Sequence, residues 1–430
     1  MVKLKLEPED FRVREVLDFV EDPSGSFFIH RLKKSKCDTT EAIGRISKGL
    51  RIRREKFAFA GLKDRQGVTE QYVSVEGRPA EFHAHGIDMR LIGRAAEPIT
   101  SKQSRGNDFR IVMRDVFVSQ IDGIEKAIER SRKDGFANYF DDQRFGSLKH
   151  GQGFPMREVA KGEFERALKA MIARPSKIAI SGDVRLKKLL AGSWGDWERC
   201  DRIARGPQYF RLFQRLIRDP EDFHGALQEL PQRQLLIHAF AYQSYLWNRA
   251  CDLWIGKRLP GYRQIRIQTE AGSFRSWSKL KDEIREEIDQ LRTPMPGPGG
   301  DGGDDSFRSA MDRVLRDADI ELNSLADHRI PGMILKEEPR RLLVRPRNPR
   351  VLEVGNDERN RRMKKVVVSF GLPRGAYATM LIKHITAESP ERGRGPRPGR
   401  RERMGEERPP AGPSKWENFE EDEGREPASE

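Results

Sequence analysis

The stretch Phe57-Ala58-Phe59-Ala60-Gly61-Leu62-Lys63-Asp64-Arg65 begins with aromatic side chains at alternate positions and ends in three consecutive charged residues. This pattern predicts a strand that breaks into a charged turn, and Thr69 to Val75 alternates again as a second strand. The two neighbouring cations favour the ionised form of the Asp64 carboxylate. Within this window alone, a surface hairpin of mixed charges remains an alternative to a functional carboxylate.

Further strand and helix patterns surround this hairpin. Strands are expected around the turn at Pro8 and over 27–32, and another follows at 109–113. A helix is expected from Asp38, because Asp38 and Glu41 have the spacing of a capping box. The first third of the chain is therefore predicted to be a sheet with helices packed against it.

The character of the sequence changes between residues 155 and 339, where helical patterns dominate. Residues 294–305 are rich in Pro, Gly and Asp, which predicts a mobile loop. A β-branched strand then returns at Val366–Phe370, and a helix follows to about residue 385. The economical interpretation is that this late strand rejoins the first sheet and that the middle of the chain is an insertion.

These patterns predict three parts. A discontinuous domain comprises residues 1–154 and 340–386, an inserted and mainly helical domain comprises 155–339, and a charged tail comprises 387–430. The tail is expected to be disordered, because it lacks enough apolar surface to fold.

Bulk properties narrow the class of protein. The chain has 430 residues, enough for two or more domains with a sizeable core. It contains no run of about 18 apolar residues that could span a membrane. Its charged N-terminus and its three widely spaced cysteines (Cys37, Cys200 and Cys251) indicate a reduced, cytoplasmic protein.

The charge balance favours a polyanionic partner. The formal net charge is +14, and the nine basic and twelve acidic residues of 387–430 leave +17 for the rest of the chain. An excess of this size is typical of proteins that bind nucleic acid, although a basic surface can serve other anions.

Metal and nucleotide sites find little support in the sequence. His83 and His85 form the only close pair of histidines, and no third ligand is near them in sequence. The glycine-rich run at 298–303 lacks the Lys and Ser/Thr of a phosphate-binding loop. We therefore expect no metal and no cofactor.

A second informative stretch is Asn138-Tyr139-Phe140-Asp141-Asp142-Gln143-Arg144-Phe145-Gly146. Its aromatic residues could be ordinary core side chains beside a capped turn. Alternatively, an aromatic face could stack on an extruded base while an amide orients that base. The stretch alone does not separate these interpretations.

Taken together, several blocks resemble the TruD family of tRNA pseudouridine synthases, in its archaeal branch. They run in order from residue 5 to about residue 385, so the resemblance covers nearly all of the chain except the tail. The blocks are Pro8–Phe11, Ala60–Arg65, Gly106–Phe109, Asn138–Phe140 with Gln143–Gly146, Ala241–Arg249 and Leu372–Thr379.

The resemblance implies an α+β fold with a mixed-sheet pseudouridine synthase core, built from both chain ends and interrupted by the TRUD domain. It also implies isomerisation of a uridine in tRNA, typically at position 13 in the D-arm, without metal or cofactor. The catalytic residue of the family falls on Asp64. Lys5, Asn138 and Phe140 fall on its supporting residues, and Lys5 is the expected ionic partner of Asp64.

Other residues of these blocks are expected to support the site or the RNA. Glu9 and Tyr377 are candidates for active-site support. Lys63, Arg65, Arg144 and Arg374 are candidates for contact with RNA, although Lys63 and Arg65 could equally be structural.

Two departures from the family pattern stand out. Asp141-Asp142 replaces small residues, which puts two acids near a site that binds phosphates. Lys383-His384 stands where an Arg-Glu pair is common, which leaves the role of the last helix open.

Two other functions are possible on sequence grounds. A non-catalytic RNA-binding or RNA-folding protein could use the same scaffold. A hydrolase would need a second carboxylate with a defined role, and only Glu9 or Asp142 offers one. Nothing in the sequence demands a partner subunit, so we expect a monomer that binds tRNA.

Overall fold

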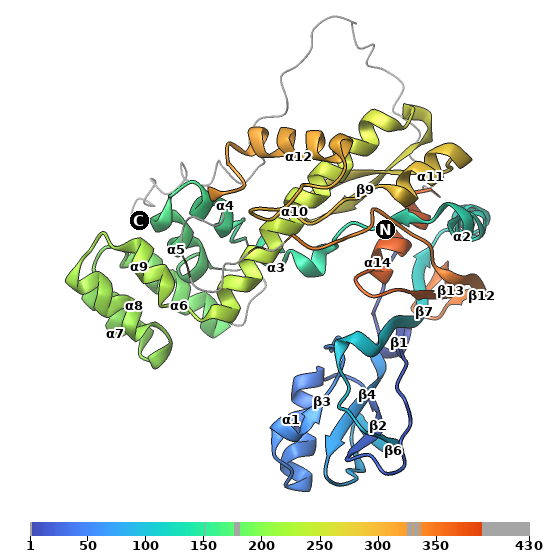
Figure 1. Ribbon diagram of the computed structural model, residues 1–430, viewed down its shortest axis with the longest axis horizontal. Coiled ribbons are helices and arrows are strands. Elements are labelled where there is room, and N and C mark those ends of the chain that lie inside the picture. The colour runs from blue at the N-terminus through green and yellow to red at the C-terminus, as the bar shows by residue number, and fades with distance from the viewer. Residues whose placement is uncertain are drawn as a thin grey trace, which may run out of the picture. The chain divides into compact units, whose positions relative to one another are not determined.

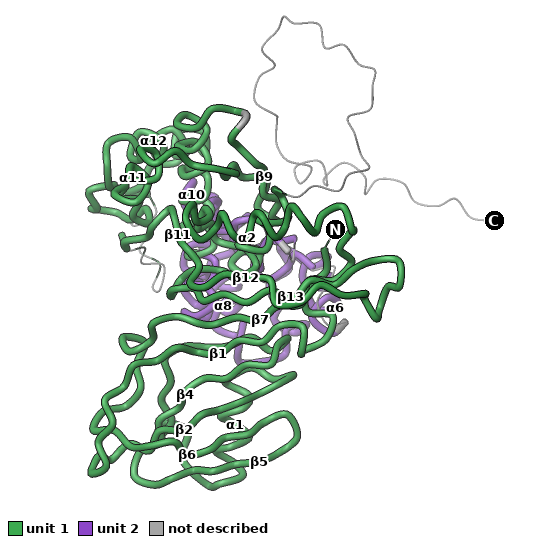
Figure 2. The backbone as a smooth tube through the Cα atoms, turned by 90° about the vertical axis from the view of Figure 1, so that its right-hand side faces the viewer, with its two compact units in different colours: residues 1–145, 239–392 green, residues 146–238, 393–430 purple. Residues whose placement is uncertain are grey.

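The computed structural model describes residues 2–149, 151–175, 181–324, 330, 335 and 337–388. The chain divides into two compact units, residues 1–145 with 239–392 and residues 146–238 with 393–430 (Figure 2). The bounds of these units differ from those of the predicted parts, because the described residues of 239–339 belong to the same unit as residues 2–145. The division at 154/155 and 339/340 stays a prediction about sequence domains.

Unit 1 contains a nine-stranded mixed sheet in the order β12-β13-β7-β1-β4-β2-β6-β5, with β3 paired to β4. Only β1 and β4 pair in parallel; the other neighbouring strands are antiparallel. The strands are β1 Phe11–Leu17, β2 Phe27–Lys34, β3 Phe57–Ala58, β4 Val68–Glu76, β5 Phe82–Ala84, β6 Ile87–Ala95, β7 Ser104–Val116, β12 Arg347–Asp357 and β13 Asn360–Leu372.

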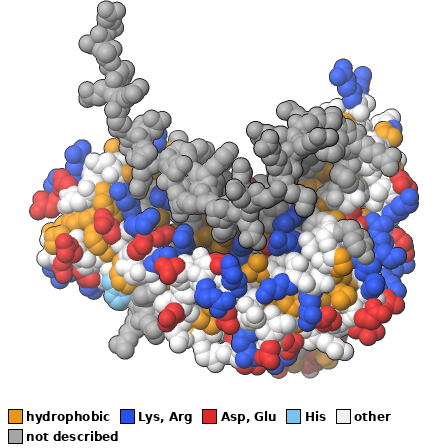
Figure 3. Space-filling view, turned by 90° about the horizontal axis from the view of Figure 1, so that it is seen from above, with side chains coloured by type: hydrophobic (Ala, Val, Ile, Leu, Met, Phe, Trp, Pro, Cys, Tyr) orange, Lys and Arg blue, Asp and Glu red, His pale blue; other side chains and the backbone are white. Residues whose placement is uncertain are grey.

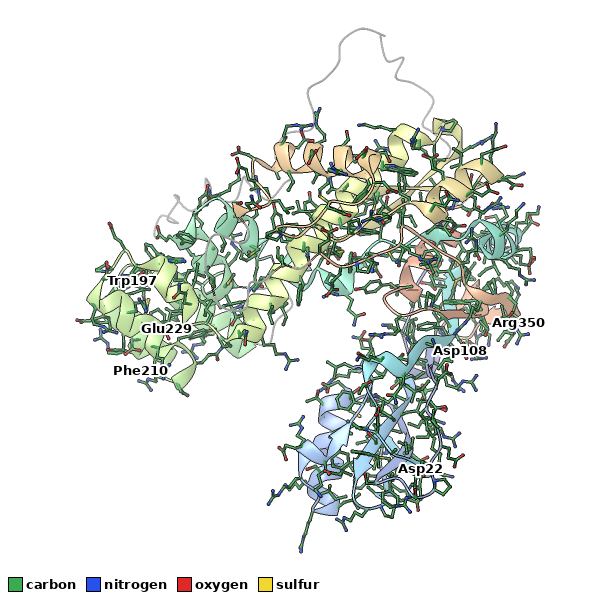
Figure 4. The ribbon with its side chains drawn as sticks, viewed as in Figure 1. Asp22, Asp108, Trp197, Phe210, Glu229 and Arg350 are labelled. Atoms are coloured by element: carbon green, nitrogen blue, oxygen red, sulfur yellow. The ribbon has the colours of Figure 1, made fainter. Side chains whose placement is uncertain are left out.

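The late strand β13 does rejoin the first sheet, as predicted. It pairs with β7 in antiparallel register, with Val368 opposite Ile111 and Phe370 opposite Phe109. Asp108 on β7 reinforces the junction, because it accepts bonds from Arg14 of β1 at 3.0 Å and Arg347 of β12 at 3.4 Å (Figure 4). The sheet is therefore built from both chain ends, which confirms the predicted α+β class.

Helices and smaller ribbons complete unit 1 (Figure 1). Two-stranded ribbons pair β8 with β11 and β9 with β10. The elements are α1 Thr39–Leu50, α2 Ile121–Asp134, most of α10 Gln232–Arg258, α11 Asp282–Gln290, α12 Asp305–Ala318, α14 Ala378–Ala387, β8 Phe136–Ala137, β9 Gln264–Thr269, β10 Gly272–Trp277, β11 Leu343–Val344 and the 3-10 turns η1 Pro8–Asp10, η2 Arg54–Lys56, η3 Ser101–Gln103, η4 Val118–Gln120, η5 Asp142–Arg144 and η6 Gly261–Arg263.

Helix α1 covers the sheet next to the hairpin that carries Asp64 (Figure 1). The Asp38 side chain caps it by accepting a bond from the Glu41 N–H at 2.9 Å, as the sequence predicts. Ala42, Ile43 and Ile46 pack on buried residues of the sheet, including Leu32, Val73, Val75 and Met89. This apolar contact fixes the helix against the strands, because burial of such side chains is the main stabilising term in folding.

Unit 2 is helical over its described residues. Its elements are α3 Gly146–Lys149, α4 Pro155–Ala160, α5 Phe164–Ile172, α6 Ser181–Gly192, α7 Trp197–Ala204, α8 Pro207–Arg218, α9 Phe223–Gln228 and the start of α10. Trp197 of α7 is buried, whereas Phe210 of α8 is half-exposed (Figure 4).

Two predictions about irregular segments need correction. Residues 294–305 form no helix or strand before α12, but Pro294–Gly297 is buried rather than mobile. Trp247 Nε1 donates to the Thr293 carbonyl and Gln243 Nε2 to the Pro296 carbonyl, both at 2.8 Å. Ala387 and Glu388, which the sequence assigns to the tail, are part of the folded chain, because Ala387 ends α14 and the Glu388 side chain is buried; the rest of the tail lies outside the described residues.

Candidate active site

Asp64 lies in the loop between β3 and β4, and its carboxylate is held from two sides. Lys5 Nζ lies 3.1 Å from Asp64 Oδ2, and Gln143 Nε2 donates to Asp64 Oδ1 at 2.6 Å. The Asp64 side chain is 32% exposed, so it remains open to a ligand. The structure thus brings to the Asp64 carboxylate two residues that lie far from it in the sequence.

Lys5 reaches this position through an unusual backbone conformation. Its φ is +58°, in the left-handed region that non-glycine residues seldom occupy. Its ammonium also lies 4.2 Å from the centre of the Phe11 ring, a favourable cation–π distance. The turn before η1 therefore directs Lys5 toward Asp64, the pairing that the resemblance implied.

Buried side chains fix the backbone of the Asp64 loop. The Lys63 N–H donates to Thr39 Oγ1 at 2.9 Å, and that hydroxyl donates to Gln71 Oε1 at 2.7 Å. The amide of Gln71 donates in turn to the Gly61 carbonyl at 3.2 Å. Both Thr39 and Gln71 are fully buried, so the loop is anchored to α1 and β4.

Neither cation beside Asp64 in sequence takes part in holding its carboxylate. The Lys63 side chain is 11% exposed, and its ammonium lies 2.7 Å from the buried Glu15 Oε1. This structural pairing argues against the predicted contact of Lys63 with RNA, because breaking a buried ion pair is costly. Arg65 is exposed and pairs with Glu41 at 2.6 Å.

Within the described chain, the segment 138–145 contains buried polar atoms without hydrogen-bond partners, unlike the Asp64 loop, although most of its residues are buried. Asn138 is 5% exposed, and its Nδ2 donates to the Arg341 carbonyl at 3.1 Å. This bond assigns the amide orientation and leaves Asn138 Oδ1 buried with no hydrogen-bond partner among the described residues. Arg144 Nε and Arg340 Nε are also buried without hydrogen-bond partners among the described residues.

Phe140 is enclosed by aromatic and basic side chains. Its ring is 6% exposed and meets Trp247 and Tyr377 edge to face, with ring centres 5.8 and 6.1 Å away. The guanidinium carbon of Arg340 lies 3.7 Å from the centre of the Phe140 ring, and that of Arg144 lies 5.3 Å away. Arg340 is anchored by bonds to the Gly375 and Asn138 carbonyls, whereas no such bond holds Arg144 among the described residues.

Burial lowers the pKa of Arg340 to about 10, although Tyr377 and Cys251 act in the opposite direction. The group still carries its charge at neutral pH. A positive charge therefore lies directly beside the aromatic ring of this segment.

The two departures from the family pattern contact one another. Lys383 Nζ donates to Asp141 Oδ1 at 2.5 Å and to Asp142 Oδ2 at 2.6 Å. Asp142 Oδ1 also accepts the Glu270 N–H at 2.7 Å. Lys383 thus pairs with both acids and attaches α14 to the segment that carries Gln143, which gives this helix a structural role.

The remaining predicted site residues make no hydrogen bond or ion pair with Asp64 in the described structure. Glu9 is exposed in η1. Arg374 is exposed and donates to the Ser101 carbonyl, and Tyr377 precedes the first residue of α14 and touches Phe140. Of these, only Tyr377 joins the cluster around Phe140.

Sequence reasoning missed three residues of this site. Gln143 stood within a quoted motif without a role, although it bonds directly to Asp64. Arg340 carries no signal in the sequence, because its position over Phe140 arises only in the fold. Lys34 was overlooked as well, although it lies in phase with the buried Leu32 along β2.

The described residues contain no group of three His, Cys, Asp or Glu that could hold a metal ion. His83 pairs instead with Asp88. Across the same residues, no helix is both long and apolar enough to cross a membrane. The three cysteines are buried and unpaired with one another.

Known proteins share this architecture. The model of the family described as tRNA pseudouridine synthase D (TruD) matches residues 1–385. A tRNA pseudouridine synthase D from Aquifex aeolicus is 30% identical over 394 residues, which cover 89% of this chain and 98% of that protein. One from Leptospira interrogans is 27% identical over 398 residues, which cover 90% and 96%.

A solved structure of a tRNA pseudouridine synthase D from the archaeon Methanosarcina mazei matches with a TM-score of 0.68. The identity is 24%, and the match covers 90% of this chain and 93% of that one. The mixed sheet with its large insertion is therefore the fold of a tRNA pseudouridine synthase D. Together with the match over residues 1–385, this shows that the chain belongs to the TruD family.

Proposed function

We propose that this protein isomerises a uridine in tRNA to pseudouridine, at position 13 in the D-arm, with Asp64 as the catalytic residue. The observation that carries the proposal is the partly exposed Asp64 carboxylate held between Lys5 and Gln143. This site lies within a chain whose family and curated relatives bear the name of that activity.

The reaction exchanges one bond for another within the nucleotide. The bond between C1′ and N1 breaks, the uracil turns, and a bond forms between C1′ and C5. The proton leaves C5 and N1 gains one, so no external reactant is consumed. Asp64 serves as a nucleophile or as a base in this sequence, and Lys5 supplies a fixed positive charge beside its carboxylate.

Asn138 is suited to bind the edge of the uracil base rather than to hold Asp64. Its Nδ2 is already bonded to the Arg341 carbonyl, and its buried Oδ1 lacks a partner among the described residues. An acceptor of this kind suits the N3–H of uracil, whereas cytosine presents an acceptor at the same position. Binding of uracil would remove the cost of leaving Asn138 Oδ1 unpaired.

Phe140 offers a stacking surface for the extruded base. Because the ring is almost fully covered, one of its neighbours moves when a base binds. Arg144 is the better candidate, since two carbonyls anchor Arg340 while Arg144 Nε lacks a partner among the described residues. Once displaced, the Arg144 guanidinium is available to a phosphate of the tRNA.

The protein surface is compatible with a broad contact to tRNA. On the face in Figure 3, Lys and Arg side chains form several groups with acidic side chains between them. Such a distribution favours several separate phosphate contacts, with Arg65 and Arg374 as candidates.

We propose that the protein acts as a monomer in the cytoplasm.

A direct test is incubation of the protein with unmodified tRNA that carries the uridine, followed by mapping of pseudouridine. We expect product from the wild type and none above background from Asp64→Asn, with tRNA affinity unchanged within about threefold. Absence of product with the wild type contradicts the activity. Turnover by Asp64→Asn contradicts the assignment of the catalytic residue.

Neither alternative function has an observation in its favour. A non-catalytic RNA-binding protein does not require an ammonium and an amide directed at one carboxylate. A hydrolase requires a second catalytic carboxylate, but Asp142 is bonded to Lys383 and Glu9 lies exposed in η1. Asp64→Asn separates these cases, because a binding protein keeps its function in that variant.

A further inference from the structure

Lys34 is a buried lysine at the end of β2, and its ammonium lies beneath the Asp64 loop. It is 1% exposed. Its Nζ donates to the carbonyl oxygens of Cys37, Lys63 and Asp64 at 2.9, 3.0 and 2.9 Å. Two of these carbonyls belong to consecutive residues, so the ammonium clamps the peptide groups on both sides of the Asp64 α-carbon.

The match between donors and acceptors is complete. An ammonium has three N–H donors on one atom, and three backbone carbonyls accept them. Arginine presents its donors in a flat fork, and methionine presents none. Among the common side chains, lysine is therefore the one suited to gather three carbonyls around a single point.

The base of this clamp is rigid. Lys34 lies in β2, where its backbone is paired with Thr69 of β4 and Ile87 of β6. A strand between two neighbours restricts the movement of its side chains more than a loop does. Through its hydrogen bonds, Lys34 therefore holds the Asp64 loop in a fixed position relative to the sheet.

The clamp on the backbone complements the contacts on the side chain. Lys5 and Gln143 hold the two carboxylate oxygens of Asp64, whereas Lys34 holds its main-chain carbonyl. The Asp64 carboxylate can keep one orientation only if both its backbone and its side chain are fixed.

Stability alone does not explain a lysine at this position. Burial lowers the pKa of Lys34, although Cys37, Asp38 and Asp64 act in the opposite direction. Each hydrogen bond that the structure gives its ammonium goes to a carbonyl, so the charge is buried without a bonded counter-ion. Burial of a charge without a counter-ion costs free energy, which the three hydrogen bonds to carbonyls have to offset.

We propose that Lys34 is a positioning residue of the reaction, which holds the backbone of Lys63 and Asp64 so that the Asp64 carboxylate faces the ribose and base of the bound uridine. The inference rests on the proposed function of Asp64. It assigns to Lys34 no contact with the substrate, so its loss reduces the rate of reaction and leaves binding of tRNA intact.

The test compares Lys34→Met with wild type under single-turnover conditions with excess enzyme over unmodified tRNA. The rate of pseudouridine formation is measured beside the dissociation constant for the same tRNA. Lys33→Met is the matched control, because Lys33 is the neighbouring lysine of the same strand and is exposed.

We expect Lys34→Met to form pseudouridine at least 100-fold more slowly, with tRNA affinity unchanged within about threefold. Lys33→Met stays within about twofold of wild type in both measurements. A rate for Lys34→Met within threefold of wild type overturns the proposal. Weakened binding with an unchanged rate overturns it too, since that result describes an RNA contact.

A second variant covers the case in which Lys34→Met does not fold. Lys34→Arg keeps the charge but cannot place three donors on one point, so we expect a rate at least 10-fold lower with unchanged tRNA affinity. A wild-type rate for a folded Lys34→Arg then overturns the proposal. Product formed by the wild type shows in every case that a failure concerns Lys34 and not the proposed activity.

Discussion

The Asp64 loop and the segment 138–145 approach each other at one hydrogen bond, from Gln143 to Asp64, yet they are built differently. The loop is bonded to Lys34, Thr39 and Gln71, which are all buried. Segment 138–145 instead contains buried polar atoms that find no partner within the described part of the chain. The comparison indicates that one region fixes the reacting group, while the other keeps hydrogen-bonding capacity for a ligand.

Among the residues around Asp64, the largest effect is expected from removal of the cation beside its carboxylate. Lys5→Met should lower the single-turnover rate of pseudouridine formation about 1,000-fold, or about 4 kcal/mol of transition-state stabilisation. The reason is the loss of the charge 3.1 Å from Asp64 Oδ2. Lys3→Met serves as the control, because exposed Lys3 pairs with Asp115. Equal rates for the two variants would show that Lys5 is not needed.

Removal of the Lys383 ammonium should destabilise segment 138–145, whereas the hydrogen bonds that fix the Asp64 loop stay in place. Lys383→Met leaves buried Asp141 and partly buried Asp142 without their cation and should cost about 2–3 kcal/mol of unfolding free energy. Chemical denaturation measures this cost, and Lys383→Arg is expected to retain most of the stability. A loss below about 0.5 kcal/mol would contradict a structural role for the cluster.

The same cluster predicts a dependence on pH. Burial acts to lower the pKa of Lys383, but Asp141 and Asp142 more than offset burial and raise that pKa above 10.5. The protonated Lys383 therefore stabilises the folded protein fully below pH 10.5. This stabilisation is lost as the pH rises through the pKa of Lys383 in the folded protein. The stability difference between wild type and Lys383→Met should therefore narrow above pH 10.5. A difference that stays constant up to the alkaline limit of folding would contradict this account.

The bond that joins the two regions should have an intermediate effect. Gln143→Leu removes the donor 2.6 Å from Asp64 Oδ1 and should reduce the single-turnover rate about 30-fold, or about 2 kcal/mol. Gln268→Leu is a suitable control, because exposed Gln268 bonds only to Ser273 among the described contacts. A normal rate for Gln143→Leu would mean that the loop and Lys5 orient Asp64 without Gln143.

The smallest effect is expected from the unpaired acceptor. Asn138→Ala should reduce kcat/KM for the tRNA about 10-fold, or about 1.4 kcal/mol, because one hydrogen bond to the base is lost. Asn356→Ala, at an exposed position on β12, controls for loss of an amide. An unchanged kcat/KM for Asn138→Ala would rule out reading of the base by its Oδ1.

The sequence predicts the sheet better than it predicts the site. The return of Val366–Phe370 to the first sheet follows from its β-branched pattern, and the start of α1 follows from the Asp38 cap. The motif order also singles out Lys5 and Asp64, which the structure brings within 3.1 Å. Local periodicity and motifs are sufficient for these features.

The residues that were missed depend on contacts distant in sequence. The alternation along β2 places Lys34 on the buried face with Leu32, but its contacts with the carbonyls of Lys63 and Asp64 arise only in the fold. Asp141-Asp142 and Lys383-His384 were treated as separate departures, although Lys383 joins them across about 240 residues of sequence. Such pairings follow from tertiary structure, which single-sequence patterns do not contain.

The pairing of β13 with β7 has a consequence for synthesis of the chain. During translation, β7 leaves the ribosome about 250 residues before β13, because Met113 pairs with Val366. Over that interval one edge of β7 exposes unpaired backbone groups that can recruit other chains. Chaperone binding to nascent chains should therefore persist until residues 360–372 have emerged, and proteins truncated before this strand should aggregate.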